Sequence, residues 1–326
     1  NPLKYRKNLL FIFVFFCLLS WSARIVEPKA YTIESGVESR DIHAINVLSE
    51  PPQTLQVLFL GDSEIQTGVL PMELWNTYGI TSYVCGQSGQ RTMESYFWLK
   101  KVLKTQTPKL VVLETDQFYH CRDMQTELKH MIKNTAHYYF PVFKYHNRWK
   151  TWGNSGNIVS ITERNPLKGY NYHDETKPYT GRIYMKETDT KEKSKLFVRF
   201  WMDRILNLCR ENDIDVLLLG IPAPLNWSYE RHNEVNEYAL GKGVPYVDLN
   251  LMAKDLGMNW ETDTMDGGDH LNINGAKKVT AYLGAYLKRN YALTDFRENR
   301  MYQYWNRDWK KYMEITGKVP IISGDF

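Results

Sequence analysis

The chain has 326 residues, of which 43% are apolar and 24% charged, and this composition is typical of a globular protein. It excludes a largely disordered chain, a collagen-like chain and a membrane protein with many spans. The 41 basic and 37 acidic residues leave a net charge of +4, and three of the positive charges (Lys4, Arg6 and Lys7) precede residue 8. Because the remainder is nearly neutral, no concentrated basic face and no nucleic-acid partner are expected.

An uninterrupted apolar run occupies residues 9–19, and its apolar character continues weakly to Val26. A helix over residues 7–26 would be about 30 Å long, which matches the hydrocarbon core of a bilayer. Positive charges precede the run, so the N-terminus is expected in the cytoplasm and the rest of the chain outside the cell. We therefore predict a single-pass anchor in the cell membrane over residues 1–26. A cleaved signal peptide and a buried helix of a soluble protein are the alternatives.

Residues 27–54 are mostly polar, contain Pro51-Pro52 and are predicted to form a stalk. Beyond them, short apolar runs alternate with segments of helical length. Strands buried on both faces are apolar throughout, as these runs are. The pattern predicts a three-layer α/β/α domain over residues 55–298, with a parallel, five-stranded, flavodoxin-like sheet. The five predicted strands lie at residues 57–60, 81–85, 110–113, 216–219 and 244–247.

The third and fourth predicted strands are about 100 residues apart, which is too far for one crossover helix. Residues 117–195 are therefore predicted to be an insertion, and an amphipathic helix over residues 195–212 leads into the fourth strand. The insertion is rich in aromatic residues, and so is a tail at residues 299–326. The tail is expected either to pack against the insertion or to stand near the membrane.

Two segments could carry acyl-transfer chemistry. Ser63 follows the first predicted strand and opens a helix, where unpaired backbone N–H groups and the helix dipole favour an anionic transition state. His270 lies in an Asp/His cluster just before the last helix of the domain. A serine nucleophile needs such a base and a carboxylate that orients it.

The residues LFLGDSE resemble the first motif of the SGNH/GDSL hydrolase superfamily, and YVCGQSGQRT, ending at Thr92, resembles its second. The resemblance extends over residues 55–290 without the insertion and implies the SGNH hydrolase fold. It implies that Ser63 is the nucleophile and His270 the base. It also implies that the backbone N–H groups of Ser63 and Gly89 form the oxyanion hole.

Two departures from the superfamily pattern concern its other polar positions. The last motif is normally D-x-x-H, but Gly267 stands three residues before His270. The orienting carboxylate must come from Asp266 or Asp269. We favour Asp266, because adjacent side chains rarely face each other, whereas Asp266 can fold back across Gly267-Gly268. The third motif normally supplies an Asn, where this chain has Thr115 and Asp116. An ionised Asp116 would repel an oxyanion, so it must be protonated, turned away or replaced by another donor.

Within the superfamily, the N-terminal anchor and the HLNxxGAxK segment resemble DltD and AlgX-type proteins. This resemblance implies an O-acyltransferase or esterase that works beside a membrane-bound O-acyltransferase. It would handle acetyl or D-alanyl groups of a cell-surface polysaccharide or teichoic acid. A secreted carbohydrate or lipid esterase and a noncatalytic polymer-binding protein are the alternatives.

Aromatic and basic side chains in and near the insertion suit a sugar or an anionic polymer, although a small packed hydrophobic subdomain explains the aromatic residues equally well. Asn272 is expected to hold the loop that carries His270. The sequence predicts no cofactor, no metal site and no disulfide framework. The residues predicted to contact substrate are Glu64, Gln66, Arg91, Tyr119, Arg148, Trp149 and Tyr170.

Overall fold

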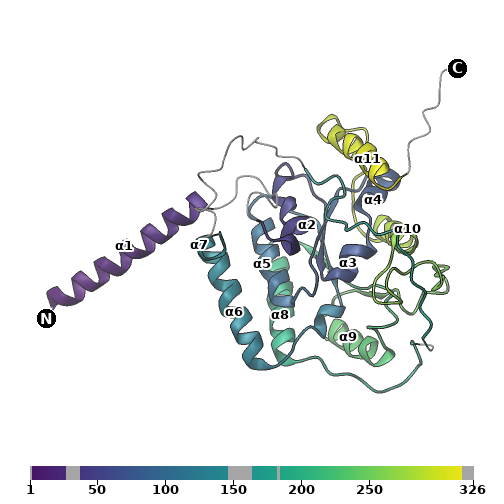
Figure 1. Cartoon of the computed structure of the whole chain (residues 1–326), viewed down its shortest axis with the longest axis horizontal. Helices are drawn as coiled ribbons and strands as arrows, with labels where there is room; N and C mark the ends of the chain where they lie inside the picture. The colour runs from purple at the N-terminus through teal and green to yellow at the C-terminus, as the bar shows by residue number, and fades with distance from the viewer. Residues whose placement is uncertain (1, 27–36, 146–163, 182–183, 318–326) are drawn as a thin grey trace. The chain divides into compact units, whose positions relative to one another are not determined.

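The structure is a computed structural model that describes residues 2–26, 37–145, 164–181 and 184–317 (Figure 1). The chain divides into two compact units. One unit contains residues 1–42 and 122–163, and the other contains residues 43–121 and 164–326. Arg148 and Trp149, two of the predicted binding residues, lie outside the described residues.

The larger unit is built on a parallel sheet with the strand order β2-β1-β3-β4-β5. The register places the last residues of neighbouring strands side by side, with Gly61 of β1 opposite Gly86 of β2. Every residue of β1, β2 and β3 is buried, which explains why these strands are apolar runs without alternation. The predicted fold class is confirmed. The strands are β1 (Val57–Gly61), β2 (Ser82–Gly86), β3 (Leu110–Glu114), β4 (Asp215–Gly220) and β5 (Tyr246–Asp248).

Helices cover both faces of this sheet. On one face, Val57, Phe59 and Val112 belong to a core that includes side chains of α3 (Ser63–Gly68), α4 (Pro71–Tyr78) and α10 (Ile273–Asn290). Elsewhere, α5 (Thr92–Val102) packs against α8 (Leu196–Glu211), and these two helices contact β1 and β4, respectively. The helix α9 (Tyr229–Lys242) contacts β5, and a short turn, η3 (Asp116–Phe118), follows β3.

Residues 43–54 are folded onto this unit, so the predicted stalk is wrong for that part. The segment contains most of α2 (Ile42–Ile45) and all of η2 (Asn46–Ser49), and Ala44 and Ile45 are completely buried. The Tyr83 hydroxyl donates to the carbonyl of His43 (2.9 Å). Apolar residues among the polar ones therefore attach this segment to β2.

The tail also packs onto the larger unit, through η5 (Arg300–Tyr302) and α11 (Gln303–Ile315). Trp305 is fully buried, and its ring centroid lies 5.4 Å from that of Trp75 in α4. The buried Lys168 Nζ contacts carboxylates of Glu50 and Asp308, each at 2.7 Å. Since Lys168 belongs to the predicted insertion, the structure supports the expectation that the tail packs against that segment.

The smaller unit contains α1 (Pro2–Val26), α6 (Met124–Tyr139) and α7 (Pro141–Tyr145), together with η1 (Ser39–Asp41). Within α1, residues Tyr5–Ala23 are long and apolar enough to cross a membrane, although an N-terminal signal sequence has the same properties. The helices α1 and α7 pack together, and the rings of Phe16 and Phe140 lie 5.8 Å apart.

Candidate active site

The predicted nucleophile lies in the tight turn between β1 and α3. Ser63 is the first residue of α3, and the side chain of Asp62 caps the helix by accepting the backbone N–H of Glu64 (2.9 Å). The turn packs closely against the end of β2, because a Cβ atom at Gly86 would lie 2.7 Å from the carbonyl oxygen of Asp62. Glycine at position 86 therefore allows the serine to sit at the carboxyl edge of the sheet.

The loop before α10 brings the predicted base to this serine. His270 Nε2 lies 2.7 Å from Ser63 Oγ, and His270 Nδ1 lies 2.6 Å from Asp266 Oδ2. The three residues form a continuous Ser-His-Asp chain of hydrogen bonds. Each distance falls within the range expected for a nucleophile, its base and the carboxylate that orients the base.

Asp266 reaches His270 because the chain between them folds back on itself. Gly267 and Gly268 adopt φ angles of +90° and +109°, which side chains disfavour. The backbone N–H groups of Asp269 and His270 donate to Asp266 Oδ1 at 3.1 and 2.8 Å. By contrast, Asp269 Oδ2 lies 3.5 Å from His270 Nδ1, and its other oxygen accepts a hydrogen bond from Asn226. The geometry favours Asp266 as the orienting carboxylate.

The same contacts keep Asp266 ionised. Partial burial alone would raise the pKa of this carboxyl, but the hydrogen bonds from the His270 side chain and backbone lower the pKa overall. Asn272 anchors the following residues, since its Oδ1 caps α10 and its Nδ2 donates to the carbonyl of Thr262 (2.8 Å). This agrees with the role expected for Asn272.

Gly89, the predicted second oxyanion donor, lies in a turn after β2. The N–H of Gln90 donates to the carbonyl of Gln87 (3.0 Å), and Gly89 has a φ of +56° within that turn. The ends of β1 and β2 are paired at Gly61 and Gly86, so the loops that carry Ser63 and Gly89 leave the same edge of the sheet. Their placement is compatible with the predicted oxyanion hole.

Asp116 occupies the place of the missing third-motif Asn, but its carboxylate is turned toward two cationic groups. Its Oδ2 lies 2.8 Å from His120 Nε2, and its Oδ1 lies 3.2 Å from Arg231 Nη1. An acceptor held in this way is not suited to donate a hydrogen bond to an oxyanion. The structure therefore removes Asp116 as an oxyanion donor and matches the "turned away" alternative.

His120 is a residue that the sequence reasoning did not assign to the site. Its Nε2 contacts Asp62 (3.3 Å) as well as Asp116, and its Nδ1 lies 3.2 Å from the carbonyl of Gln90. It thus joins the nucleophile turn, the end of β3 and the Gly89 turn. The four-residue spacing from Asp116 to His120 was a signal for this contact, whereas Arg231 lies 115 residues away and had none.

Buried carboxyl groups are concentrated at the nucleophile turn and at the end of the neighbouring strand β3. Asp62, Glu64 and Glu114 are all almost completely buried. Burial, followed by the neighbouring Asp116 charge, raises the pKa of Asp62 to about 6 and raises the pKa of Glu64 further above its usual range. Burial lowers the pKa of His120, but its contacts with Asp116 and Asp62 outweigh this effect and raise it to about 9. A protonated His120 therefore offsets part of the negative charge.

Several predicted binding residues are placed differently from the expectation. Glu64, Gln66 and Tyr170 are buried, with exposed fractions of 2%, 5% and 0%, so their side chains do not offer a surface to a polymer. Tyr119 is partly exposed, and the guanidinium of Arg231 lies 4.2 Å from its ring centre. Arg91 is also partly exposed and precedes α5. The burial of the first three side chains is the reason why that prediction fails for them.

No protein-family model matches the chain, and neither does any curated protein. Similar solved structures include a GDSL-like lipase from Bacteroides thetaiotaomicron, with 11% identity and a TM-score of 0.39 over 78% of this chain and 98% of that one. A lipase/acylhydrolase from Enterococcus faecalis has 15% identity and a TM-score of 0.35 over 74% of this chain and 98% of that one. Because these identities and TM-scores are low, the roles of the site residues are argued from the contacts within this chain.

Proposed function

We propose that the chain is a serine esterase or O-acyltransferase of the SGNH/GDSL type. The observation that carries the proposal is the hydrogen-bonded chain from Ser63 Oγ through His270 to Asp266. Its parts come from two loops separated by more than 200 residues, which the sheet brings to one edge. Convergence of a nucleophile, a base and an orienting carboxylate is what acyl transfer requires.

The proposed first half-reaction transfers the acyl group to the enzyme. Ser63 Oγ attacks the ester carbonyl while His270 takes its proton, and Asp266 stabilises the resulting imidazolium. The backbone N–H groups of Ser63 and Gly89 would bind the oxyanion. The tetrahedral intermediate then collapses, the ester C–O bond breaks, and His270 returns the proton to the leaving alcohol.

The second half-reaction restores the free serine. Water or an acceptor hydroxyl attacks the acyl carbonyl, and His270 again takes the proton and returns it to Ser63 Oγ. With water the products are a free acid and the regenerated enzyme, whereas with an acceptor hydroxyl the product is a new ester. The two outcomes differ only in which hydroxyl reaches the acyl-enzyme.

A fluorophosphonate probe tests the esterase chemistry because it reacts covalently with an activated serine. The native full-length chain is expected to be labelled, and Ser63→Ala is expected to lose the label. Ser88→Ala is a matched control, since this serine lies in the neighbouring Gly89 turn and should leave labelling intact. Retained labelling of the Ser63 variant would reject the assignment.

For the finer function, we propose transfer of acetyl or D-alanyl groups onto a cell-surface polysaccharide or teichoic acid. What supports it is the candidate membrane span, which would hold the chain at the membrane, and the resemblance of HLNxxGAxK to DltD and AlgX-type proteins. A membrane-bound O-acyltransferase is the proposed partner. Purified enzyme, one acyl donor and the polymer would be used to compare polymer acylation with release of free acid. Acid release that the polymer does not reduce would favour a hydrolase.

A further inference from the structure

One side of α6 exposes apolar side chains at four-residue intervals. Met124, Leu128 and Ile132 have exposed fractions of 63%, 47% and 61%. This spacing places the three side chains on one face of the helix. A helix on the surface of a globular protein normally turns such a face toward the core. On α6, Glu127, which lies between Met124 and Leu128 in the sequence but on another side of the helix, is buried instead (1% exposed). The apolar face therefore points outward.

The segment that follows α6 contacts the candidate membrane span. Phe140, directly after α6, packs its ring on Phe16 of α1. Phe16 lies seven residues before Ala23, the last residue of the span, and this corresponds to about 10 Å along a helix. Where α1 crosses a bilayer, a side chain in contact with Phe16 therefore lies below the headgroups, within the outer half of the hydrocarbon core.

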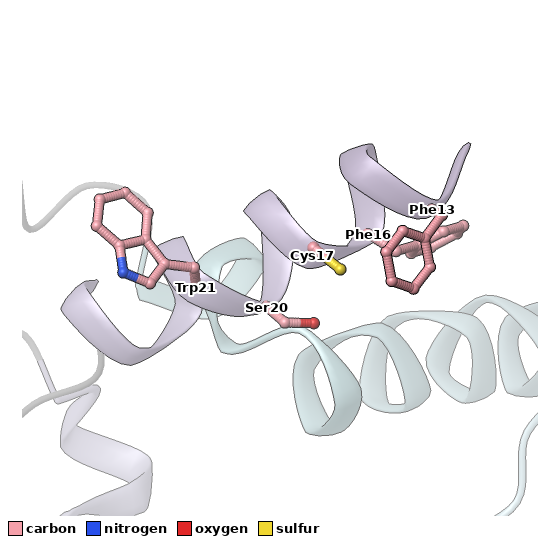
Figure 2. Close-up of a pocket in the computed structure, with 5 residues that line it drawn as sticks. All are labelled: Phe13, Phe16, Cys17, Ser20 and Trp21. Carbon is pink, nitrogen blue, oxygen red and sulfur yellow. The ribbon is translucent and has the colours of Figure 1, made fainter. Parts of the chain in front are cut away.

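The surface of α1 near this contact is open enough for an acyl chain. A pocket on α1 has a volume of about 360 Å³. Figure 2 shows the side chains that line it, which are Phe13, Phe16, Cys17, Ser20 and Trp21. Only 6% of the most apolar stretch of the candidate span is buried, so the packing of α7 covers little of the span. Most of α1 and the exposed face of α6 thus present apolar surface within the same unit.

The charges beside the apolar face fit the headgroup region of a bilayer. Lys129 and Lys133 are exposed, and each follows one of the apolar residues directly, so both lie along one border of that face. Helices that lie in a membrane interface combine an apolar face with flanking lysines, whose long side chains reach the phosphates.

From these observations we infer that α6 lies in the outer interface of the membrane that α1 crosses. Met124, Leu128 and Ile132 contact lipid acyl chains, and Lys129 and Lys133 contact lipid headgroups. The inference rests on the membrane-anchoring part of the proposed function. It gives this part of the aromatic-rich insertion a lipid-binding role in place of the polymer-binding role expected from composition. We infer that the apolar face of α6 contacts lipid, because the contact with Phe16 places the end of α6 at the depth of the hydrocarbon core.

A fluorescent depth measurement on the full-length chain in vesicles tests this inference. The vesicles contain phosphatidylcholine and phosphatidylglycerol, with or without spin-labelled lipids. Single labelling sites are made in a Cys17→Ser, Cys121→Ser background, where Cys85 and Cys209 are buried. The reporter is Ile132→Cys, and the matched control is Lys133→Cys on the polar border. Native Cys17, kept in a Cys121→Ser chain, reports separately on the span.

Spin-labelled lipid is expected to quench the label at position 132 several-fold more than the label at position 133, while aqueous iodide shows the opposite order. Equal iodide quenching at both positions would overturn the inference, because the face would be in water. Protection from iodide without lipid quenching would also overturn it, in favour of a second copy or another protein. A label at Cys17 that lipid fails to quench would overturn it by removing the span. Fluorophosphonate labelling of the same samples reports on the catalytic proposal independently.

Discussion

At the scale of single residues, Asp266 and Asp269 differ in how they contact His270. Asp266 makes the 2.6 Å contact and accepts two backbone N–H groups, whereas Asp269 is 3.5 Å from the ring and is shared with Asn226. Asp266→Asn should lower kcat by about 10³- to 10⁴-fold, because the amide no longer stabilises the imidazolium or its tautomer. Steady-state kinetics with an activated ester measures this loss.

Asp269→Asn is the matched control, and its kcat should fall by less than about tenfold, since the Asp266 contact remains. A larger loss in Asp269→Asn than in Asp266→Asn would contradict the assignment. Equal circular dichroism spectra and melting temperatures of the two variants would show that the comparison concerns chemistry.

His120 makes stability depend on pH. Its contacts with Asp116 and Asp62 raise its pKa to about 9 in the folded protein, from an ordinary value near 6.5. A raised pKa means that the folded state holds the proton more tightly than the unfolded state does. The stabilisation is therefore complete below about pH 6.5 and is lost as the pH rises through about 9.

The free energy of unfolding should consequently fall between pH 6.5 and 9 in the native chain. In His120→Gln this fall should be weaker, because glutamine can donate a hydrogen bond but does not titrate. Urea unfolding at several pH values measures both slopes. An unchanged slope in His120→Gln would show that other groups cause the dependence.

The sequence indicated part of this site and could not indicate the rest. Ser63 and His270 follow from a strand-to-helix turn and a loop at the end of the domain, and Asp266 follows from the two glycines that let the chain fold back. The contact between Arg231 and Asp116 depends on the pairing of β3 with β4, which local sequence patterns do not specify.

At the scale of elements, α11 is the part of the tail that completes the larger unit. Trp305→Ala should destabilise the chain by about 3–5 kcal/mol, because it leaves a cavity beside Trp75 and removes a ring next to the Lys168 ammonium. Denaturant unfolding measures the change, and Met301→Ala, at a residue that is 74% exposed, is the control. If both variants were as stable as the native chain, the packing of α11 would contribute little.

The strands could be predicted from the sequence, whereas residues 43–54 and the packing of the tail could not. The apolar runs located all five strands to within about two residues, because burial on both faces demands continuous apolar sequence. Residues 43–54 carry no such signal, because their few apolar side chains are scattered among polar ones. The tail's packing depends on a buried ion network of Glu50, Lys168 and Asp308, whose members are far apart in the sequence.

At the level of the complete chain, α1 is the candidate membrane anchor. If Tyr5–Ala23 crosses the membrane, the full chain should remain with membranes after carbonate washing, and a chain lacking residues 1–26 should be released. Immunoblotting of the fractions measures the distribution. Release of the full chain by carbonate, or loss of its N-terminal peptide from the mature protein, would contradict an uncleaved anchor.

Trapping the acyl-enzyme tests whether Ser63 carries the acyl group. The full-length chain is mixed with p-nitrophenyl acetate, quenched in acid and digested, and the peptides are weighed by mass spectrometry. One acetyl group is expected on the peptide that contains Ser63, with none in Ser63→Ala and strongly reduced acetylation in His270→Ala. An acetyl group on a different residue of the native chain, or persistence of the adduct in Ser63→Ala, would show that Ser63 is not the nucleophile.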